Sequence, residues 1–353
     1  MDSPPGLDLT ALRAFLSSRG VAPDGPLRGT VIAGGRSNLT YTVSDDVHHW
    51  VVRRPPLAHV LPTAHDMARE WRVISALQDT GIPVPRAVLL CEDLGVIGAP
   101  FYVMDFVDGH VIRDRLPDGW PATAETGEAM STALIDTLLE LHAVAPEDVG
   151  LGDFGRPQGF LERQVRRWWQ QWEASQTREL RALEDLHQRL LDGVPVQSQP
   201  GIVHGDYRFD NVIYTPDDPH RIAAVVDWEM STVGDPLCDL GLLVVYWVTD
   251  ASDPAASALP GGRVSLGEGF PAREQMIASY AARSDRDLSN LEWYFALGHY
   301  KLAIIAEGIN ARFLLGMTVG DGFETMGPAV PLIVERALER ASASGLAGLS
   351  GGG

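Results

Sequence analysis

Residues 204–211 read HGDYRFDN, a short polar segment between the apolar runs GIV and VIY. Its histidine, aspartate and asparagine stand at the spacing H-x-D-x-x-x-x-N. The carboxylate of Asp206 can accept the proton of a hydroxyl group, and the amide oxygen of Asn211 is a hard ligand of the kind that Mg²⁺ prefers. The segment therefore predicts a catalytic loop between two strands, with Asp206 as its base.

A β-hairpin is predicted directly after this loop. The strand-like VIYT is followed by the turn-rich PDDPHR and then by the apolar run IAAVV, which ends at Asp227. Because a hairpin returns the chain to its starting point, we expect Asn211 and Asp227 side by side at its open end, near Asp206. This order of base, amide and second carboxylate is typical of phosphoryl transfer from ATP, with Mg²⁺ held by Asn211 and Asp227.

The first hundred residues predict a small lobe that combines strands with helices. Three strand-like runs fill residues 27–54, separated by Gly-rich or Asp-rich breaks, and two more lie within 84–93 and 99–109. Apolar residues at helical spacing predict helices over 8–19 and 64–81. A lobe of this kind is where a nucleotide would bind.

Two features of this lobe are candidates for holding ATP phosphates. The turn AGGRSN at 33–38, with Gly34 and Gly35, links two predicted strands where a phosphate-covering loop belongs. Kinases also place a cation on the third strand and pair it with a helix glutamate. No lysine stands there, so we interpret Arg53 as that cation and Glu70 as its partner.

From about residue 120 the periodicity becomes helical, which predicts a larger second lobe. We expect a nucleotide-binding lobe over 1–107, a helical catalytic and substrate-binding lobe over 108–340, and a flexible tail over 341–353. The Pro-, Ser- and Gly-rich segment 249–271 is interpreted as a loop or lid. The fold class that follows is α/β (α+β) with two lobes.

Composition narrows the possible partners. The 353 residues carry a net charge of −19, which argues against nucleic acid and against an anionic membrane surface. The amino-terminal stretch lacks the basic region of a signal peptide, so we expect a cytoplasmic protein.

Cys91 and Cys238 stand far apart in apolar contexts and are interpreted as buried thiols. Of the 28 lysine and arginine residues only one is a lysine, Lys301.

The chain resembles the aminoglycoside phosphotransferase and choline kinase superfamily, the small-molecule branch of the protein-kinase-like fold. The resemblance covers about residues 27–335 and is carried by GGRSNLTY, VVRRPP, FYVMDFVDG, HGDYRFDNVIY, VVDWEMSTVGDPLCDLG and WYFALGHYKLAIIAEGI. Members commonly have H-G-D where protein kinases have H-R-D, which accounts for Gly205. The chain is most similar to the branch whose kinase-like domain precedes acyl-CoA dehydrogenases in some longer proteins.

The resemblance implies roles for individual residues. It implies that Asp206 is the catalytic base and that Asn211 and Asp227 are the Mg²⁺ ligands. Further implied positions are the adenine-binding hinge at Asp105 and Val107, the phosphate neighbours Ser37 and Asn38, and the loop-bracing carboxylates Asp235 and Asp239.

Two departures from protein kinases bear on the substrate. The sequence DWE replaces D-F-G, and only 11 residues separate Asp227 from Asp239. This spacing leaves no room for an activation segment, which is where protein kinases dock peptides. We therefore expect a small hydroxylated substrate and no protein substrate.

The acceptor itself stays open. The stretch 293–313 has apolar residues among a few polar ones, including Lys301, Glu307 and Arg312. This pattern is typical of a core helix, and it also suits an acyl chain with an anionic head group. The resemblance implies a hydroxyacyl-CoA or hydroxy acid as the acceptor. An aminoglycoside phosphotransferase is the alternative enzyme. A catalytically idle nucleotide-binding protein is the alternative from another class.

Overall fold

The computed structural model describes residues 3–32, 38–57, 66–252, 263–318 and 322–351. Within these ranges the chain divides into two compact units. The first comprises Met1–Gly109 and Ala223–Ser231, and the second comprises His110–Ile222 and Thr232–Gly353. The first unit thus takes a short segment from the later chain, and this segment contains Asp227.

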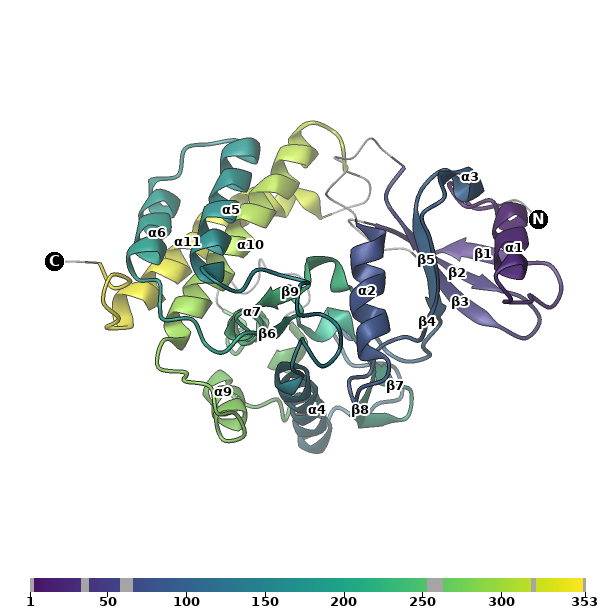
Figure 1. The fold of residues 1–353 in the computed structure, drawn as a ribbon. Coiled ribbons are helices and arrows are strands. Elements are labelled where there is room, and N and C mark those ends of the chain that lie inside the picture. Colours follow the sequence, from purple (N-terminus) through teal and green to yellow (C-terminus); the bar gives the residue numbers. More distant parts are fainter. Residues whose placement is uncertain (1–2, 33–37, 58–65, 253–262, 319–321, 352–353) are drawn as a thin grey trace. The chain divides into compact units, whose positions relative to one another are not determined.

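The first unit is built on a five-stranded antiparallel sheet, drawn in purple to blue in Figure 1. The strand order is β1-β2-β3-β5-β4. The strands are β1 (Arg28–Val31), β2 (Leu39–Ser44), β3 (His49–Arg54), β4 (Ala87–Cys91) and β5 (Phe101–Asp105). All five predicted strands are present, so the strand-like runs were interpreted correctly.

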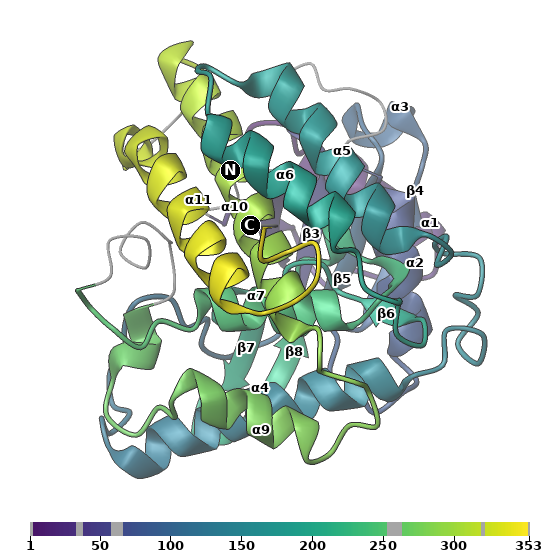
Figure 2. The same cartoon turned by 90° about the vertical axis from the view of Figure 1, so that its left-hand side faces the viewer.

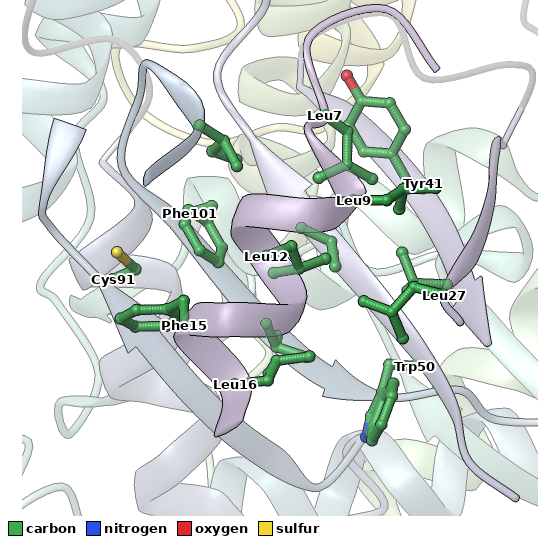
Figure 3. Packing of buried hydrophobic residues seen from close by; sticks show 14 residues of the cluster. Leu7, Leu9, Leu12, Phe15, Leu16, Leu27, Tyr41, Trp50, Cys91 and Phe101 are labelled. Carbon is green, nitrogen blue, oxygen red and sulfur yellow. The ribbon is translucent and has the colours of Figure 1, made fainter. Parts of the chain in front are cut away.

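One face of this sheet carries the apolar core of the first unit. Helix α1 (Leu9–Ser18), capped by Asp8, turns Leu12, Phe15 and Leu16 toward the sheet, where they pack with residues such as Trp50 (Figure 3). Because side chains alternate along a strand, Trp50 and Val52 of β3 share this face while Arg53 points to the other.

The opposite face is covered by helix α2 (Met67–Leu77), which contacts β4 and β5. Asp66 caps this helix by accepting a hydrogen bond from the Arg69 backbone N–H. Glu70 of α2 is buried and faces Arg53 of β3 and Tyr102 of β5. A short helix, α3 (Leu94–Ile97), precedes β5.

The second unit is mainly helical (Figure 2). Its helices are α4 (Ala124–Ala143), α5 (Phe160–Ser175), α6 (Arg181–Asp192), α7 (Leu237–Tyr246), α9 (Arg273–Ala281), α10 (Leu291–Leu314) and α11 (Met326–Ala343). Helix α10 packs against α5, α6, α7 and α11 and is buried on nearly all sides. It is therefore the central helix of this unit.

Two short sheets surround the predicted catalytic loop in sequence. Strand β6 (Gly201–Val203) enters the loop and pairs with β9 (Thr232–Gly234), while β7 (Val212–Thr215) leaves it and pairs with β8 (Asp218–Val225). The predicted hairpin is thus confirmed. Its turn is tighter than expected, because β8 begins at Asp218 and leaves only Pro216 and Asp217 between the strands.

The end of the chain differs from the flexible tail predicted over 341–353. Helix α11 continues to Ala343, and Leu349 beyond it is fully buried. Gly348, with a φ of +77°, lies so close to the Asp192 carbonyl that a Cβ would approach it to 2.6 Å. The glycines at this end of the chain predicted disorder, but Gly348 permits a turn and a close backbone contact, and the neighbouring Leu349 side chain is buried.

The predicted loop 249–271 is only partly described. Its last part forms η3 (Arg263–Leu266), where Val264 is buried and Ser265 donates to the Val248 carbonyl at 2.8 Å. Residues 253–262 lie outside the described ranges. Among the described helices, none combines the length and the apolar character needed to cross a bilayer.

Candidate active site

In the first unit, Arg53 is the centre of a buried cluster of charges. Its guanidinium contacts three carboxylates: Nε lies 3.1 Å from Glu70, and Nη2 lies 2.5 Å from Asp227 and 3.3 Å from Glu229. Although burial opposes its charge, Asp227, Tyr102, Glu70 and Glu229 raise the pKa of Arg53 above its ordinary value. Arg53 is therefore a permanent cation, and its predicted pairing with Glu70 is present.

Glu70 is fixed by neighbours on both sides. Its carboxylate accepts hydrogen bonds from the Tyr102 hydroxyl at 2.9 Å and from Asn38 Nδ2 at 2.8 Å. Burial raises the pKa of Glu70, and the charge of Arg53 partly opposes that shift. Asn38 also donates to Glu229 at 3.1 Å, so its amide bridges two of the carboxylates around Arg53.

Asp227 has an unusual backbone conformation. Its φ of +68° makes it the one non-glycine residue with a left-handed φ among the residues described. Aspartate adopts this conformation more readily than most residues, but at some energetic cost that functional sites often carry. The Trp228 indole N–H donates to the Val225 carbonyl at 3.0 Å and fixes the next residue of this turn. The turn directs the Asp227 carboxylate at Arg53.

In the second unit, the predicted catalytic loop is held by Asp239 of α7. The backbone N–H groups of His204 and Gly205 each donate to this fully buried carboxylate at 2.7 Å. Gly205 has a φ of +85°, a conformation that favours glycine, which gives a physical reason for H-G-D. The next N–H, of Asp206, donates to His204 Nδ1 at 3.2 Å. His204 therefore shapes the loop.

The Asp206 carboxylate is held by Asn211 and by nearby cations. Asn211 Nδ2 donates to Asp206 Oδ2 at 2.8 Å and to the Asp206 carbonyl at 2.7 Å, and Arg208 Nε lies 3.4 Å from Oδ2. Burial would raise the pKa of Asp206, but Arg208, Lys301 and His204 together lower it below its ordinary value. Asp206 is thus an ionised acceptor at neutral pH.

Two further groups support the region around the loop. Asp235, also fully buried, accepts hydrogen bonds from the Ser198 backbone and hydroxyl at 2.8 and 2.6 Å and from the Tyr294 hydroxyl at 2.8 Å. The Arg208 guanidinium pairs with Asp210 at 3.1 Å and lies 4.5 Å from the Tyr246 ring centroid. Asp239 thus braces the loop directly, whereas the contacts of Asp235 are with Ser198 and with Tyr294 of α10.

The proposed acceptor wall on α10 is mostly core. Trp293, Phe295 and Leu302 are buried, and Glu307 accepts hydrogen bonds from the Thr177 backbone and hydroxyl. Phe295 and its neighbours are therefore core residues of a central helix. Lys301 differs, because its ammonium donates to the Gly205 carbonyl of the predicted catalytic loop. Sequence reasoning placed Lys301 on the wall and missed this contact.

The predicted hinge residues lie at and just after the end of β5. Asp105 ends β5, its N–H donates to the Arg86 carbonyl, and its carboxylate is gripped by Arg86 at 2.7 and 3.0 Å. Val107 follows two residues later and is half-buried. Gly34, Gly35 and Ser37 lie outside the described residues, so their predicted role near phosphates stays a prediction.

The donor chemistry fits Mg²⁺. The described part of the chain holds no group of three or more His, Cys, Asp and Glu side chains arranged for a metal. Mg²⁺ usually needs only one or two protein oxygens, since waters and substrate phosphates complete its shell. Asn211 uses its amide nitrogen on Asp206, which leaves its oxygen as the atom for a metal. Asn211 lies in the second unit and Asp227 in the first.

Comparison with known proteins identifies the family of the chain. The profile of the phosphotransferase enzyme family matches residues 28–274, so the chain belongs to that family. The rat acyl-CoA dehydrogenase family member 11 is 34% identical over 334 residues, which are 92% of this chain and 42% of that protein. The Arabidopsis thaliana probable acyl-CoA dehydrogenase IBR3 is 29% identical over 322 residues, 86% of this chain and 39% of that protein. The chain therefore spans less than half the length of these relatives.

Solved structures show the same fold. The structure of "a putative aminoglycoside phosphotransferase" from Ralstonia eutropha has a TM-score of 0.79 and 30% identity, covering 95% of this chain and 98% of that one. The macrolide 2′-phosphotransferase type I has a TM-score of 0.56 and 22% identity, covering 94% and 99%. The expected protein-kinase-like fold, with a small sheet lobe and a helical part, is confirmed.

Proposed function

We propose that this protein transfers the γ-phosphoryl group of ATP, with Mg²⁺, to the hydroxyl group of a small hydroxy acid or hydroxyacyl-CoA. The observation that carries the proposal is the Asp206 carboxylate, ionised, hydrogen-bonded by Asn211 and placed on a loop that Asp239 fastens. Phosphoryl transfer needs little covalent chemistry from a protein, and depends on positioning and on charge. The proposed site residues would supply this positioning and this charge.

Asp206 is proposed as the base. Its lowered pKa keeps it an acceptor at neutral pH, so it can orient an acceptor hydroxyl and take its proton as the oxygen–phosphorus bond forms. Asn211 holds that carboxylate in one orientation through its amide nitrogen.

Arg53, Asn38 and Asp227 are proposed to bind the nucleotide. Arg53 would take the part that lysine has in other kinases, because its planar fork can contact two phosphate oxygens. Asn211 and Asp227 would be the ligands of Mg²⁺, and the metal would neutralise charge that develops on the phosphates. The backbone at Asp105 and Val107 is proposed to meet the adenine, and Gly34, Gly35 and Ser37 the phosphates.

An acyl acceptor is proposed for this site. Arg208 pairs with Asp206 and Asp210, and the Lys301 ammonium donates to the Gly205 carbonyl, so neither cation is assigned to the acceptor. The names of the relatives, acyl-CoA dehydrogenases of which this chain matches about two fifths, support an acyl acceptor.

One experiment separates the candidate functions. ADP release with Mg²⁺ and ATP is measured across hydroxy acids, hydroxyacyl-CoAs and kanamycin-type aminoglycosides. We expect release with an acyl or hydroxy acid acceptor and loss of all release in EDTA. Turnover of aminoglycosides alone would establish the antibiotic kinase instead, and nucleotide binding without turnover of any acceptor would indicate the idle protein.

A further inference from the structure

Lys301 is a buried cation at an unexpected place. It is the one lysine of the chain, it lies in the middle of α10, and only 8% of its surface is exposed. Lysine is almost never fully buried without a partner, since burial disfavours its charge. Burial does lower the pKa of Lys301, and the charges of Asp206 and Asp239 oppose that shift. Burying the Lys301 ammonium is unfavourable, so a contact that stabilises it is expected.

The hydrogen bond of Lys301 is that contact. The ammonium donates to the carbonyl of Gly205 and lies 5.6 Å from the Trp168 ring centroid. That carbonyl belongs to the peptide group that joins Gly205 to Asp206. The N–H of the same peptide group donates to His204 Nδ1 at 3.2 Å. Both ends of the peptide that precedes the base are therefore held.

The preceding peptide group is held as well. Its N–H, on Gly205, donates to Asp239 Oδ1 at 2.7 Å. Gly205 is thus held from two sides by opposite charges, the carboxylate of α7 on its N–H and the ammonium of α10 on its carbonyl. A glycine with a φ of +85° has many accessible conformations, so these contacts select one of them.

Helices α7 and α10, which carry Asp239 and Lys301, are closely packed. Gly241 of α7 lies against Tyr294, where an added Cβ would approach the Tyr294 Cβ to 2.7 Å, and Gly298 lies against Val245 at 3.1 Å. Gly298 is three residues before Lys301 on α10, hence on the same side of the helix. The two helices that carry Asp239 and Lys301 are therefore packed at short range.

We propose that Lys301 is a positioning residue for phosphoryl transfer, which holds the Gly205–Asp206 peptide so that the Asp206 carboxylate keeps one orientation. This proposal rests on the proposed function. Lys301 acts through the backbone and is not assigned a contact with acceptor or nucleotide. A neutral side chain of similar length would fill the space but leave the Gly205 carbonyl without this donor.

The test compares Lys301→Met with Arg178→Met. Arg178 lies between α5 and α6 and pairs with Glu307 of α10 at 3.1 Å, so its loss also removes a cation that contacts α10 but does not touch the loop. Hydrogen–deuterium exchange of peptides covering 201–211 is measured in the ligand-free proteins. We expect exchange in this segment to be at least about 10-fold faster in Lys301→Met and unchanged in Arg178→Met.

Turnover provides the second readout. Because a small misplacement of a catalytic group can cost about 10²-fold, we expect kcat to fall about 10- to 100-fold in Lys301→Met while KM for ATP stays within about two-fold. Unchanged loop exchange, or equal effects of the two substitutions, would overturn the proposal. If no acceptor is found for the wild type, the proposed function fails, whereas the exchange experiment still decides the role of Lys301 in the loop.

A measurement on the unmodified chain covers the case in which Lys301→Met does not fold. Protein labelled with ¹⁵N-lysine should give one side-chain ammonium signal, with proton exchange slow enough to observe because the group is buried and hydrogen-bonded. A signal lost to rapid exchange with water would contradict the contact with Gly205.

Discussion

Asp239→Asn should destabilise the second unit strongly although it changes the shape of the side chain very little. The two carboxylate oxygens of Asp239 accept the N–H groups of His204 and Gly205, each at 2.7 Å and away from solvent. Asparagine offers one acceptor oxygen, and its NH₂ group would face the other N–H. The loss of one charge-assisted hydrogen bond, plus one buried N–H left without a partner, should cost about 3–5 kcal/mol.

Calorimetric unfolding of the purified chain measures this effect. Since about 1 kcal/mol shifts Tm by roughly 2–4 °C in a unit of this size, we expect Tm to fall by about 6–20 °C. Asp118→Asn is the matched control, because Asp118 is 91% exposed and its pair with Arg115 should contribute less than about 1 kcal/mol. A fall in Tm no larger than in Asp118→Asn would refute the assignment of Asp239 as the residue that fastens the loop.

Three further results are expected. Arg53→Met should raise KM for ATP and lower kcat, because it removes the proposed phosphate cation; unchanged ATP kinetics would remove Arg53 from the site. Asp227→Ala should weaken ATP binding in Mg²⁺ but little in EDTA, as titration calorimetry can show, and equal loss in both would argue against a metal ligand. His299, buried and bonded to the Phe295 carbonyl, has its pKa lowered by burial to about 4. In the unfolded chain this histidine is protonated below about pH 6.5, whereas in the native chain it stays neutral down to about pH 4. The free energy of unfolding should therefore fall by about 3 kcal/mol as the pH is lowered through that window. His299→Gln should flatten this fall in Tm, and parallel curves for the two proteins would contradict it.

Much of the fold follows from local patterns in the sequence. Alternation along β3 predicts that Trp50 and Arg53 point to opposite faces of the sheet, and the structure places them so. The Arg53–Glu70 pair could be predicted because one candidate cation and one helix glutamate stand at the required positions. The hairpin between Asn211 and Asp227 could be predicted because its turn chemistry is local.

Other contacts depend on residues that are distant in sequence. Glu229 joins the Arg53 cluster, and Asn38 bridges it to Glu70, only because a segment 191 residues after Asn38 belongs to the first unit. The contact of Lys301 with Gly205 spans 96 residues and has no signature in local periodicity. Composition also misled at the carboxyl end, where a single buried leucine, Leu349, orders a glycine-rich segment.

The most direct test of the account is ³¹P NMR of the reaction mixture. Wild-type protein and Asp206→Asn are incubated with Mg²⁺, ATP and the best hydroxylated acceptor from the ADP-release screen. We expect a phosphomonoester signal that grows with ADP in the wild type and is reduced about 10²- to 10⁴-fold in rate in Asp206→Asn, with ATP still bound. ADP accompanied only by inorganic phosphate, or equal ester formation in both proteins, would contradict the claim that Asp206 directs phosphoryl transfer to a hydroxyl group.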